Sequence, residues 1–172
     1  KHRFASLYNY TDPIPGGIPT LEKLRADRLK IGSTTGYTRE MMDVVLPAAQ
    51  AKGYRVDYCA TPNLFPAGRP APYMIFENLI KLAVPSLDPV VKVGDTIADI
   101  KEGVNAKVCS VGVILGSNEM ALTEEETRNM PATELEARIA DVKERMLAAG
   151  ASHVIRTIEE LPALIETLNA GK

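Results

Sequence analysis

The sequence predicts an α/β fold in which helices cover both faces of a mostly parallel sheet. Three observations favour this class. Short apolar runs alternate along the chain with longer segments of helical periodicity. The run 108–115 is rich in Val and Ile, which is typical of a strand covered on both faces. A chain of 172 residues with 45% hydrophobic and 24% charged residues suits one domain with its own core.

Five strands and about six helices follow from this pattern. The predicted strands are 29–34, 55–60, 89–93, 108–115 and 152–156. The predicted helices are 18–28, 38–51, 72–83, a short one from 95 to 103, 132–148 and 158–168. Residues 116–131 are predicted to form a long loop. Its acidic cluster, Glu124–Glu126, is interpreted as the first turn of a solvated helix, where negative charge suits the helix dipole.

Composition excludes several classes of function. The net charge of −2 disfavours a broad nucleic-acid surface, which needs a basic patch. No apolar run approaches the ~20 residues that cross a bilayer, and the first residues do not form a secretory signal. Cys59 and Cys109 each lie in an apolar segment and are expected to be buried thiols in the cytoplasm. Because the chain begins with Lys1, we expect it to be part of a longer protein.

The most informative segment carries two carboxylates after a buried strand. The apolar run 89–93 ends at Gly94, and Asp95 and Asp99 follow one helical turn apart. Carboxylates at i and i+4 lie on one side of a helix start, where they suit Mg²⁺ and leave room for phosphate oxygens. The alternative is that Asp95 caps the helix and Asp99 is simply solvated.

Two further polar segments follow predicted strands, at the edge where doubly wound sheets bind ligands. The segment Gly32–Thr38 offers hydroxyl and backbone N–H donors to a phosphate or phosphonate, although such residues also serve as ordinary helix caps. Arg69 lies in a stiff loop between Gly68 and Pro70 and presents a permanent positive charge. Alone, Arg69 would be interpreted as a solvated surface residue.

Together these residue types indicate a phosphate-plus-Mg²⁺ site, and no competing catalytic set is found. The two histidines, His2 and His153, are placed where neither zinc binding nor acid–base catalysis is expected. The sequence has no Walker A loop, no G-x-G-x-x-G fingerprint and no G-x-S-x-G elbow. Lys92 lies inside a predicted strand and is interpreted as structural.

The order of these segments resembles motifs two, three and four of the haloacid dehalogenase superfamily, and most closely its phosphonoacetaldehyde hydrolase (phosphonatase) family. The resemblance runs from about residue 15 to 165. Its most specific element is Gly-Arg-Pro at 68–70, where most of the superfamily has Gly-Lys-Pro. The segments that carry it are Lys30–Met42, Pro66–Pro70, Lys92–Gly103, Val111–Ser117 and Leu122–Glu126.

The resemblance implies a three-layer, Rossmann-like core that hydrolyses the carbon–phosphorus bond of phosphonoacetaldehyde with Mg²⁺. The family uses a Schiff base on a cap-domain lysine and an aspartyl-phosphate on a motif-one Asp. A motif-three lysine could form a competing imine with the aldehyde, whereas Arg69 cannot and yet keeps the charge.

The resemblance also implies roles for residues of this chain. Asp95 matches the Mg²⁺ ligand, and Asp99 matches a second acidic residue that supports the metal site. Arg69 and Thr35 are the expected catalytic residues, because they would stabilise the charge on the phosphonyl oxygens. The expected phosphate-binding residues are Thr34, Thr35, Gly36 and Arg69.

The sequence departs from the family in one large respect. The motif-one strand, Asp-x-Ala-Gly-Thr, is absent, and so is most of the cap that bears the Schiff-base lysine. Residues 1–14 resemble only the return from cap to core, and 15–172 a partial core domain. Because the missing strand is central, we expect unpaired strand edges and a poorly stable or abnormally paired sheet.

Three functions stay open at this point. The first is phosphonoacetaldehyde hydrolysis by a longer parent protein, which family members typically carry out as homodimers on a small phosphonate. The second is a phosphatase or phosphosugar mutase of the same fold. The third is a catalytically inactive fragment or a binding module, which the missing nucleophile favours for the 172-residue chain alone.

Overall fold

The structure is a computed structural model that describes residues 4–6 and 14–171. In that part of the chain it contains six β-strands, seven α-helices and two short 3₁₀ helices. The strands are β1 (Phe4–Ser6), β2 (Lys30–Thr34), β3 (Tyr58–Ala60), β4 (Val90–Gly94), β5 (Cys109–Val113) and β6 (His153–Ile155). The α-helices are α1 (Gly17–Ala26), α2 (Arg39–Ala51), α3 (Tyr73–Lys81), α4 (Ile97–Asn105), α5 (Glu124–Asn129), α6 (Ala132–Ala148) and α7 (Leu161–Ala170). The 3₁₀ helices are η1 (Pro62–Leu64) and η2 (Ile158–Glu160).

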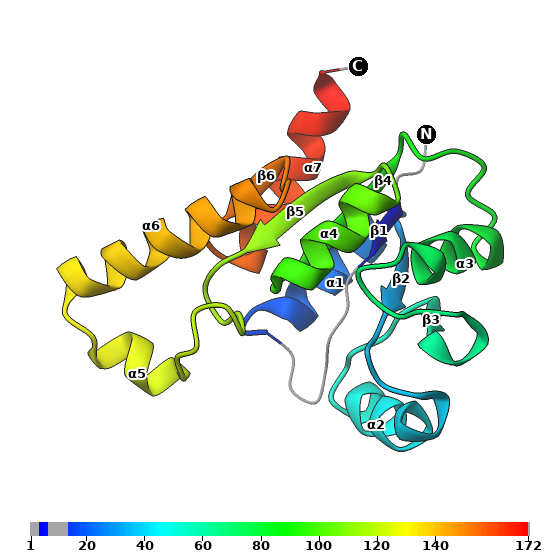
Figure 1. Ribbon diagram of the computed structural model, residues 1–172, viewed down its shortest axis with the longest axis horizontal. Helices are drawn as coiled ribbons and strands as arrows, with labels where there is room; N and C mark the ends of the chain where they lie inside the picture. The colour runs from blue at the N-terminus through cyan, green and yellow to red at the C-terminus, as the bar shows by residue number, and fades with distance from the viewer. Residues whose placement is uncertain (1–3, 7–13, 172) are drawn as a thin grey trace.

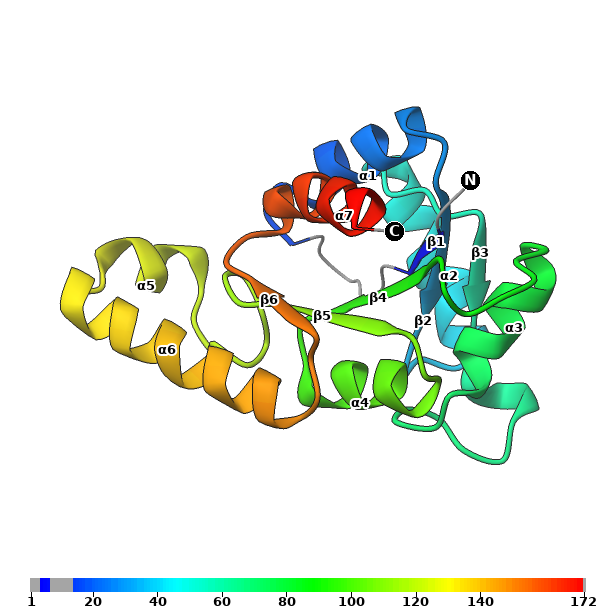
Figure 2. The same cartoon turned by 90° about the horizontal axis from the view of Figure 1, so that it is seen from above.

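The six strands form one parallel sheet in the order β3-β2-β1-β4-β5-β6 (Figure 1). Figure 2 shows α1 and α7 on one face of this sheet and α4 on the other. The alternation of strands with helices therefore produces the expected three-layer arrangement, and the predicted fold class is confirmed.

The centre of the sheet requires a correction. We expected an empty place between β2 and β4, but β1 fills it, with Ala5 opposite Ile31 on one side and Val91 on the other. The backbone N–H and C=O groups of β2 and β4 need partners, and an extended segment within reach supplies them. The remaining residues of the expected linker remnant, 1–3 and 7–13, lie outside the described residues.

One strand boundary differs from the prediction for an identifiable reason, and one expected helix is found inside the predicted loop. β3 begins at Tyr58, later than the predicted residue 55, because the carboxylate of Asp57 accepts the backbone N–H of Ile31 at 2.7 Å in place of a ladder carbonyl. The predicted loop 116–131 contains α5, whose N-cap Thr123 forms a capping box with Glu126. The helix expected at the acidic cluster is thus confirmed.

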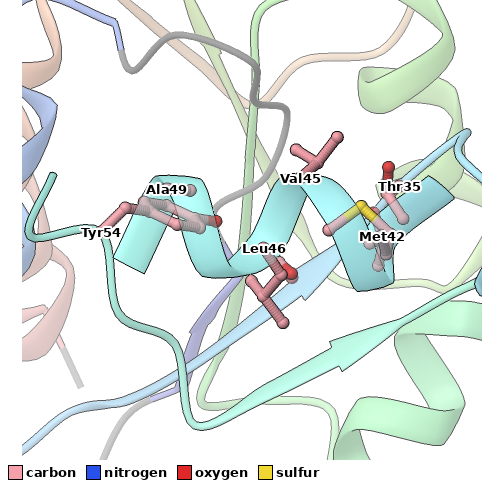
Figure 3. Close-up of a pocket in the computed structure, with 8 residues that line it drawn as sticks. Thr35, Met42, Val45, Leu46, Ala49 and Tyr54 are labelled. Carbon is pink, nitrogen blue, oxygen red and sulfur yellow. The ribbon is translucent and has the colours of Figure 1, made fainter. Parts of the chain in front are cut away.

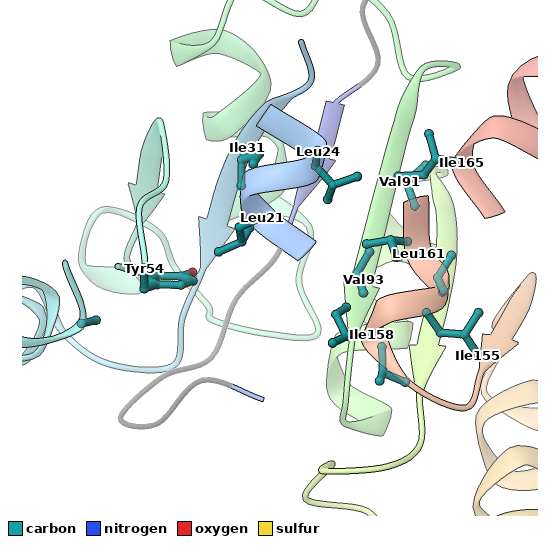
Figure 4. Packing of buried hydrophobic residues seen from close by; sticks show 13 residues of the cluster. Leu21, Leu24, Ile31, Tyr54, Val91, Val93, Ile155, Ile158, Leu161 and Ile165 are labelled. Carbon is teal, nitrogen blue, oxygen red and sulfur yellow. The ribbon is translucent and has the colours of Figure 1, made fainter. Parts of the chain in front are cut away.

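The main apolar cluster lies between the sheet and the helices α1 and α7 (Figure 4). Val91 and Val93 of β4 belong to it, together with Leu161 of α7. Because successive side chains of a strand point to opposite faces, Lys92 lies on the other face of β4, towards α4. In the described residues, no helix combines the length and the apolar character that a membrane crossing requires.

Candidate active site

The predicted polar segments meet at the carboxyl edge of the central strands. β2 ends at Thr34 and β4 ends at Gly94, and only β1 separates these two strands in the sheet. Since all strands are parallel, the loops that follow them leave the sheet at the same edge. This topology brings the threonine segment and the aspartate segment to neighbouring positions.

In the threonine segment, only the last residue acts as a helix cap. Thr38 is the N-cap of α2, and its side chain accepts the backbone N–H of Met41. Thr35 is buried, and its Oγ1 accepts the N–H of Tyr37 at 3.1 Å, which stabilises the turn after β2. Thr34 is fully buried and accepts a hydrogen bond from Lys92 Nζ at 2.9 Å. The capping alternative is therefore wrong for Thr34 and Thr35.

Arg69 is not a solvated surface residue. Its side chain is only 17% exposed and donates from Nη1 to Oδ1 of Asp99. Its Nε lies 3.9 Å from Oε2 of Glu102. A Cβ added to Gly36 would lie 3.1 Å from Arg69 Nη2, so the turn after β2 touches the guanidinium. The structure thus brings together Gly36, Arg69 and Asp99, three of the residues that the sequence predicts for the site.

The aspartate segment is organised around Thr96, a residue that was not predicted to belong to the site. Thr96 is the N-cap of α4 and forms a capping box with Asp99. Oδ2 of Asp99 accepts both the N–H and the hydroxyl of Thr96, at 3.1 and 2.6 Å. Asp99 is completely buried and divides its oxygens between Thr96 and Arg69, so the idea that it is simply solvated is wrong. Asp95 does not cap the helix either.

Asp95 is buried at the end of β4, where its Oδ2 accepts the N–H of Asn118 at 3.2 Å. Asn118 lies in the loop after β5, which therefore contributes to the site and was not predicted to do so. The donor set fits Mg²⁺ in part. Asp95 supplies one hard carboxylate of the kind that Mg²⁺ uses together with phosphate oxygens, while Asp99 is engaged with Arg69. The described residues contain no cluster of three or more acidic, His or Cys ligands.

Two buried charged residues, Lys92 and Glu102, lie below the site. From the sequence, Lys92 was interpreted as structural, and Glu102 was given no role. Lys92 is 1% exposed, and its Nζ lies 3.7 Å from Oε1 of Glu102, which is fully buried in α4. The signal was present in the sequence. A lysine between two buried valines needs an acidic partner. Glu102 stands three residues after Asp99 and thus shares its helix face.

Burial shapes the titration of this pair. Burial lowers the pKa of Lys92, and the nearby carboxylates of Glu102 and Asp99 oppose that change. Burial likewise raises the pKa of Glu102, and the positive charge of Lys92 opposes that rise. Among the described residues, neither carboxylate oxygen of Glu102 finds a regular hydrogen-bond donor. The two charges therefore depend on each other for stabilisation.

A small cavity lies between β2 and α2 rather than over the charged residues (Figure 3). It measures about 10 Å³, which is room for one water molecule at most. Thr34 and Thr35 are among its lining residues, whereas Arg69 and Asp95 do not line it. The other lining residues are Ser33, Met42, Val45, Leu46, Ala49 and Tyr54.

Comparison with known proteins gives consistent results. The chain is 82% identical over 170 residues to phosphonoacetaldehyde hydrolase of Bacteroides fragilis, covering 99% of this chain and 65% of the relative. It is 64% identical over 169 residues to phosphonoacetaldehyde hydrolase of Parabacteroides distasonis, covering 98% of this chain and 64% of the relative. The chain thus spans slightly less than two thirds of the length of these relatives.

A solved structure agrees with these relatives. A phosphonoacetaldehyde hydrolase-like protein from Oleispira antarctica superposes with a TM-score of 0.86 at 32% identity, covering 91% of this chain and 57% of that one. A model of haloacid dehalogenase-like hydrolases matches residues 2–107, which include β1, Thr35, Arg69 and both aspartates. The chain therefore belongs to the haloacid dehalogenase-like hydrolase family.

Proposed function

We propose that the chain is the core portion of a Mg²⁺-dependent phosphonoacetaldehyde hydrolase, which converts phosphonoacetaldehyde and water to acetaldehyde and phosphate. The similarity to the phosphonoacetaldehyde hydrolases of Bacteroides fragilis and Parabacteroides distasonis supports this reaction. The structural observation that carries it is Arg69, held by Asp99 beside Gly36. A guanidinium keeps its charge and forms no imine, so it suits a substrate that joins a phosphonate to an aldehyde.

Arg69 and Thr35 bind the phosphonyl group in this proposal. The forked donors of Arg69 neutralise its oxygens, and Asp99 fixes the direction of the fork. Thr35 uses an oxygen lone pair to accept from Tyr37, which leaves its hydroxyl hydrogen to donate. Thr34 accepts from Lys92 and is fully buried. We therefore assign the main hydroxyl contact to Thr35 and a supporting role to Thr34.

Asp95 is the residue that would hold Mg²⁺, and Asp99 would support the site through Arg69 and Thr96 rather than as a direct ligand. When bound, Mg²⁺ supplies positive charge that neutralises and orients the phosphonyl oxygens. The backbone N–H of Asn118 keeps the carboxylate of Asp95 directed at the carboxyl edge of the sheet.

The nucleophilic Asp and the imine-forming Lys that the family uses do not match residues of this chain. β1 ends at Ser6 and contains no Asp. This observation favours a second candidate, in which the 172-residue chain by itself binds Mg²⁺ and phosphate without hydrolysing a phosphonate. We further infer that the complete protein acts in the cytoplasm as a homodimer, as the family resemblance implies.

The first test uses a fusion protein that provides the nucleophilic Asp and the imine-forming Lys. Residues 1–172 replace the matching part of the Bacteroides fragilis relative, and release of acetaldehyde from phosphonoacetaldehyde is measured with and without Mg²⁺. We expect Mg²⁺-dependent release and loss of activity on treatment with borohydride and substrate together, because borohydride reduces a Schiff base. Release of phosphate from sugar phosphates, with no acetaldehyde from the phosphonate, would instead support a phosphatase or mutase.

Arg69→Lys is the matched variant for this assay. It keeps the charge but loses the fork that contacts Asp99, and we expect kcat/KM to fall about tenfold or more. Unchanged activity of this variant would contradict the assigned role of Arg69. The unfused chain, assayed in parallel, decides whether the second candidate applies to it.

A further inference from the structure

We propose that Lys92 and Glu102 form a positioning pair that holds Thr34 and Arg69 at a fixed separation and thereby shapes the anion site above them. This inference deepens the proposed function, since it rests on the anion site. Neither residue is a candidate for touching the substrate, because both side chains are closed off from solvent. Their effect must therefore pass through Thr34 and Arg69.

Lys92 ties together two strands that are not neighbours. It stands in the middle of β4, yet its Nζ donates to Oγ1 of Thr34 at the end of β2, with β1 lying between the two strands. Two strand spacings separate β2 from β4 by roughly 10 Å. The long stem of a lysine can span the face of the central strand, which the other residues of β4 are too short to do. Lys92 thus fixes the end of β2 relative to β4.

Glu102 continues this connection to the arginine. Its Oε1 lies 3.7 Å from Lys92 Nζ and its Oε2 lies 3.9 Å from Arg69 Nε. Arg69 is therefore placed between two acidic residues of α4, one at each end of its guanidinium. The series Thr34, Lys92, Glu102, Arg69 connects both predicted phosphate-binding segments through the interior.

The packing of α4 is adapted to this arrangement. At Gly103 an added Cβ would lie 3.0 Å from Cβ of Lys92 and 2.2 Å from Oγ of Ser110. Only glycine allows α4 to approach the sheet so closely, and this approach brings Glu102 to Lys92. A pair needed only for stability has an apolar alternative, because well-packed apolar residues often replace a buried ion pair at no cost. A positioning role explains why a charged pair stands here.

The test separates positioning from stability in the 172-residue chain. The probe is inorganic phosphate with Mg²⁺, titrated by calorimetry, and stability is measured by urea unfolding. The variants are Lys92→Met, Glu102→Gln and the double variant Lys92→Met with Glu102→Met. Leu24→Ala is the matched control, since Leu24 is fully buried in the apolar cluster on the opposite face of the sheet.

We expect each single variant to lose at least tenfold in phosphate affinity. The double variant removes both charges together, so its urea midpoint should return close to that of the unsubstituted chain while its tenfold loss of affinity persists. Leu24→Ala should unfold at lower urea and bind phosphate as the unsubstituted chain does. If a single variant does not fold, the double variant decides the question.

Three results would overturn the inference. They are wild-type affinity in the double variant, an equal loss of affinity in Leu24→Ala, and no phosphate binding by the unsubstituted chain. Failure of the proposed function gives a different result. The fusion of residues 1–172 with the Bacteroides fragilis relative would then not hydrolyse phosphonoacetaldehyde. Phosphate binding that depends on Lys92 and Glu102 would then still support the positioning pair.

Discussion

The two faces of strand β4 differ sharply although both are buried. On one face, Val91 and Val93 pack against the apolar side chains of α1 and α7. On the other, Lys92 lies among the charged residues that connect α4 with Arg69. An apolar face stabilises through area removed from water, whereas a buried charged face costs desolvation and is stable only when every charge is paired. Val91 and Val93 thus belong to an entirely apolar cluster, whereas the other face combines the charged residues around Lys92 with a smaller apolar cluster around Val90.

The largest expected effect belongs to the apolar face. Leu161→Ala removes a fully buried side chain from the cluster around β4, and we expect the free energy of unfolding to fall by about 2–5 kcal/mol. Phosphate affinity of the folded fraction should not change, because Leu161 has no part in the charged face. Urea unfolding and calorimetry measure the two quantities. A parallel loss of affinity would show that the two faces do not act independently.

A glycine substitution tests the charged face in the same way. Gly103→Ala places a Cβ against Lys92 and Ser110, so α4 must shift, and we expect about 1–3 kcal/mol of destabilisation together with weaker phosphate binding. Gly17→Ala is the matched control, because a Cβ there meets no atom within 4 Å. Equal phosphate affinity in both variants would argue that the approach of α4 does not matter for the site.

A pH experiment measures how much stability is lost when a buried tyrosine of the apolar cluster would have to ionise. Tyr54 is buried in the cluster, and burial raises the pKa of its hydroxyl above the ordinary value of 10.0. The unfolded chain therefore releases this proton first, and stability falls as pH rises above about 10, by about 1.4 kcal/mol per pH unit. Tyr54→Phe lacks this contribution. Urea unfolding of both proteins at pH 9 to 11 should show the difference, and parallel curves would contradict it.

The smallest effect on stability is expected where the turn after β2 touches Arg69. Gly36→Ala brings a Cβ to 3.1 Å from Nη2 and should displace the guanidinium slightly, reducing phosphate affinity several-fold with little change in stability. Gly68→Ala is the matched control, since its Cβ would make an ordinary 3.5 Å contact with Pro62. If Gly68→Ala alone lost phosphate affinity, the anion would lie on the side of Arg69 away from Gly36, which would contradict the proposed site.

The comparison of the two faces also explains what the sequence could predict. The strand ends were predictable, because Thr34 and Asp95 follow apolar runs at places where the hydrophobic pattern stops. Lys92 and Glu102 were not assigned to the site. A lysine between buried valines indicates that an acidic partner is needed, but the identity of that partner depends on how closely α4 packs at Gly103, a tertiary distance that periodicity does not encode. The strand β1 was missed for a related reason. Three residues carry little pattern of their own, and the unpaired edges of β2 and β4 determine their pairing.

A crystallographic experiment can locate the ligands of the proposed site, where a divalent cation and a tetrahedral oxyanion meet between Asp95, Arg69 and Thr35. Crystals of the chain grown with Mn²⁺ in place of Mg²⁺ and with phosphate would locate the cation by its anomalous scattering. We expect Mn²⁺ on the carboxylate of Asp95 and phosphate within hydrogen-bonding distance of Arg69 and Thr35. Cation and anion bound at separate places, with Asp95 contacting neither, would contradict it.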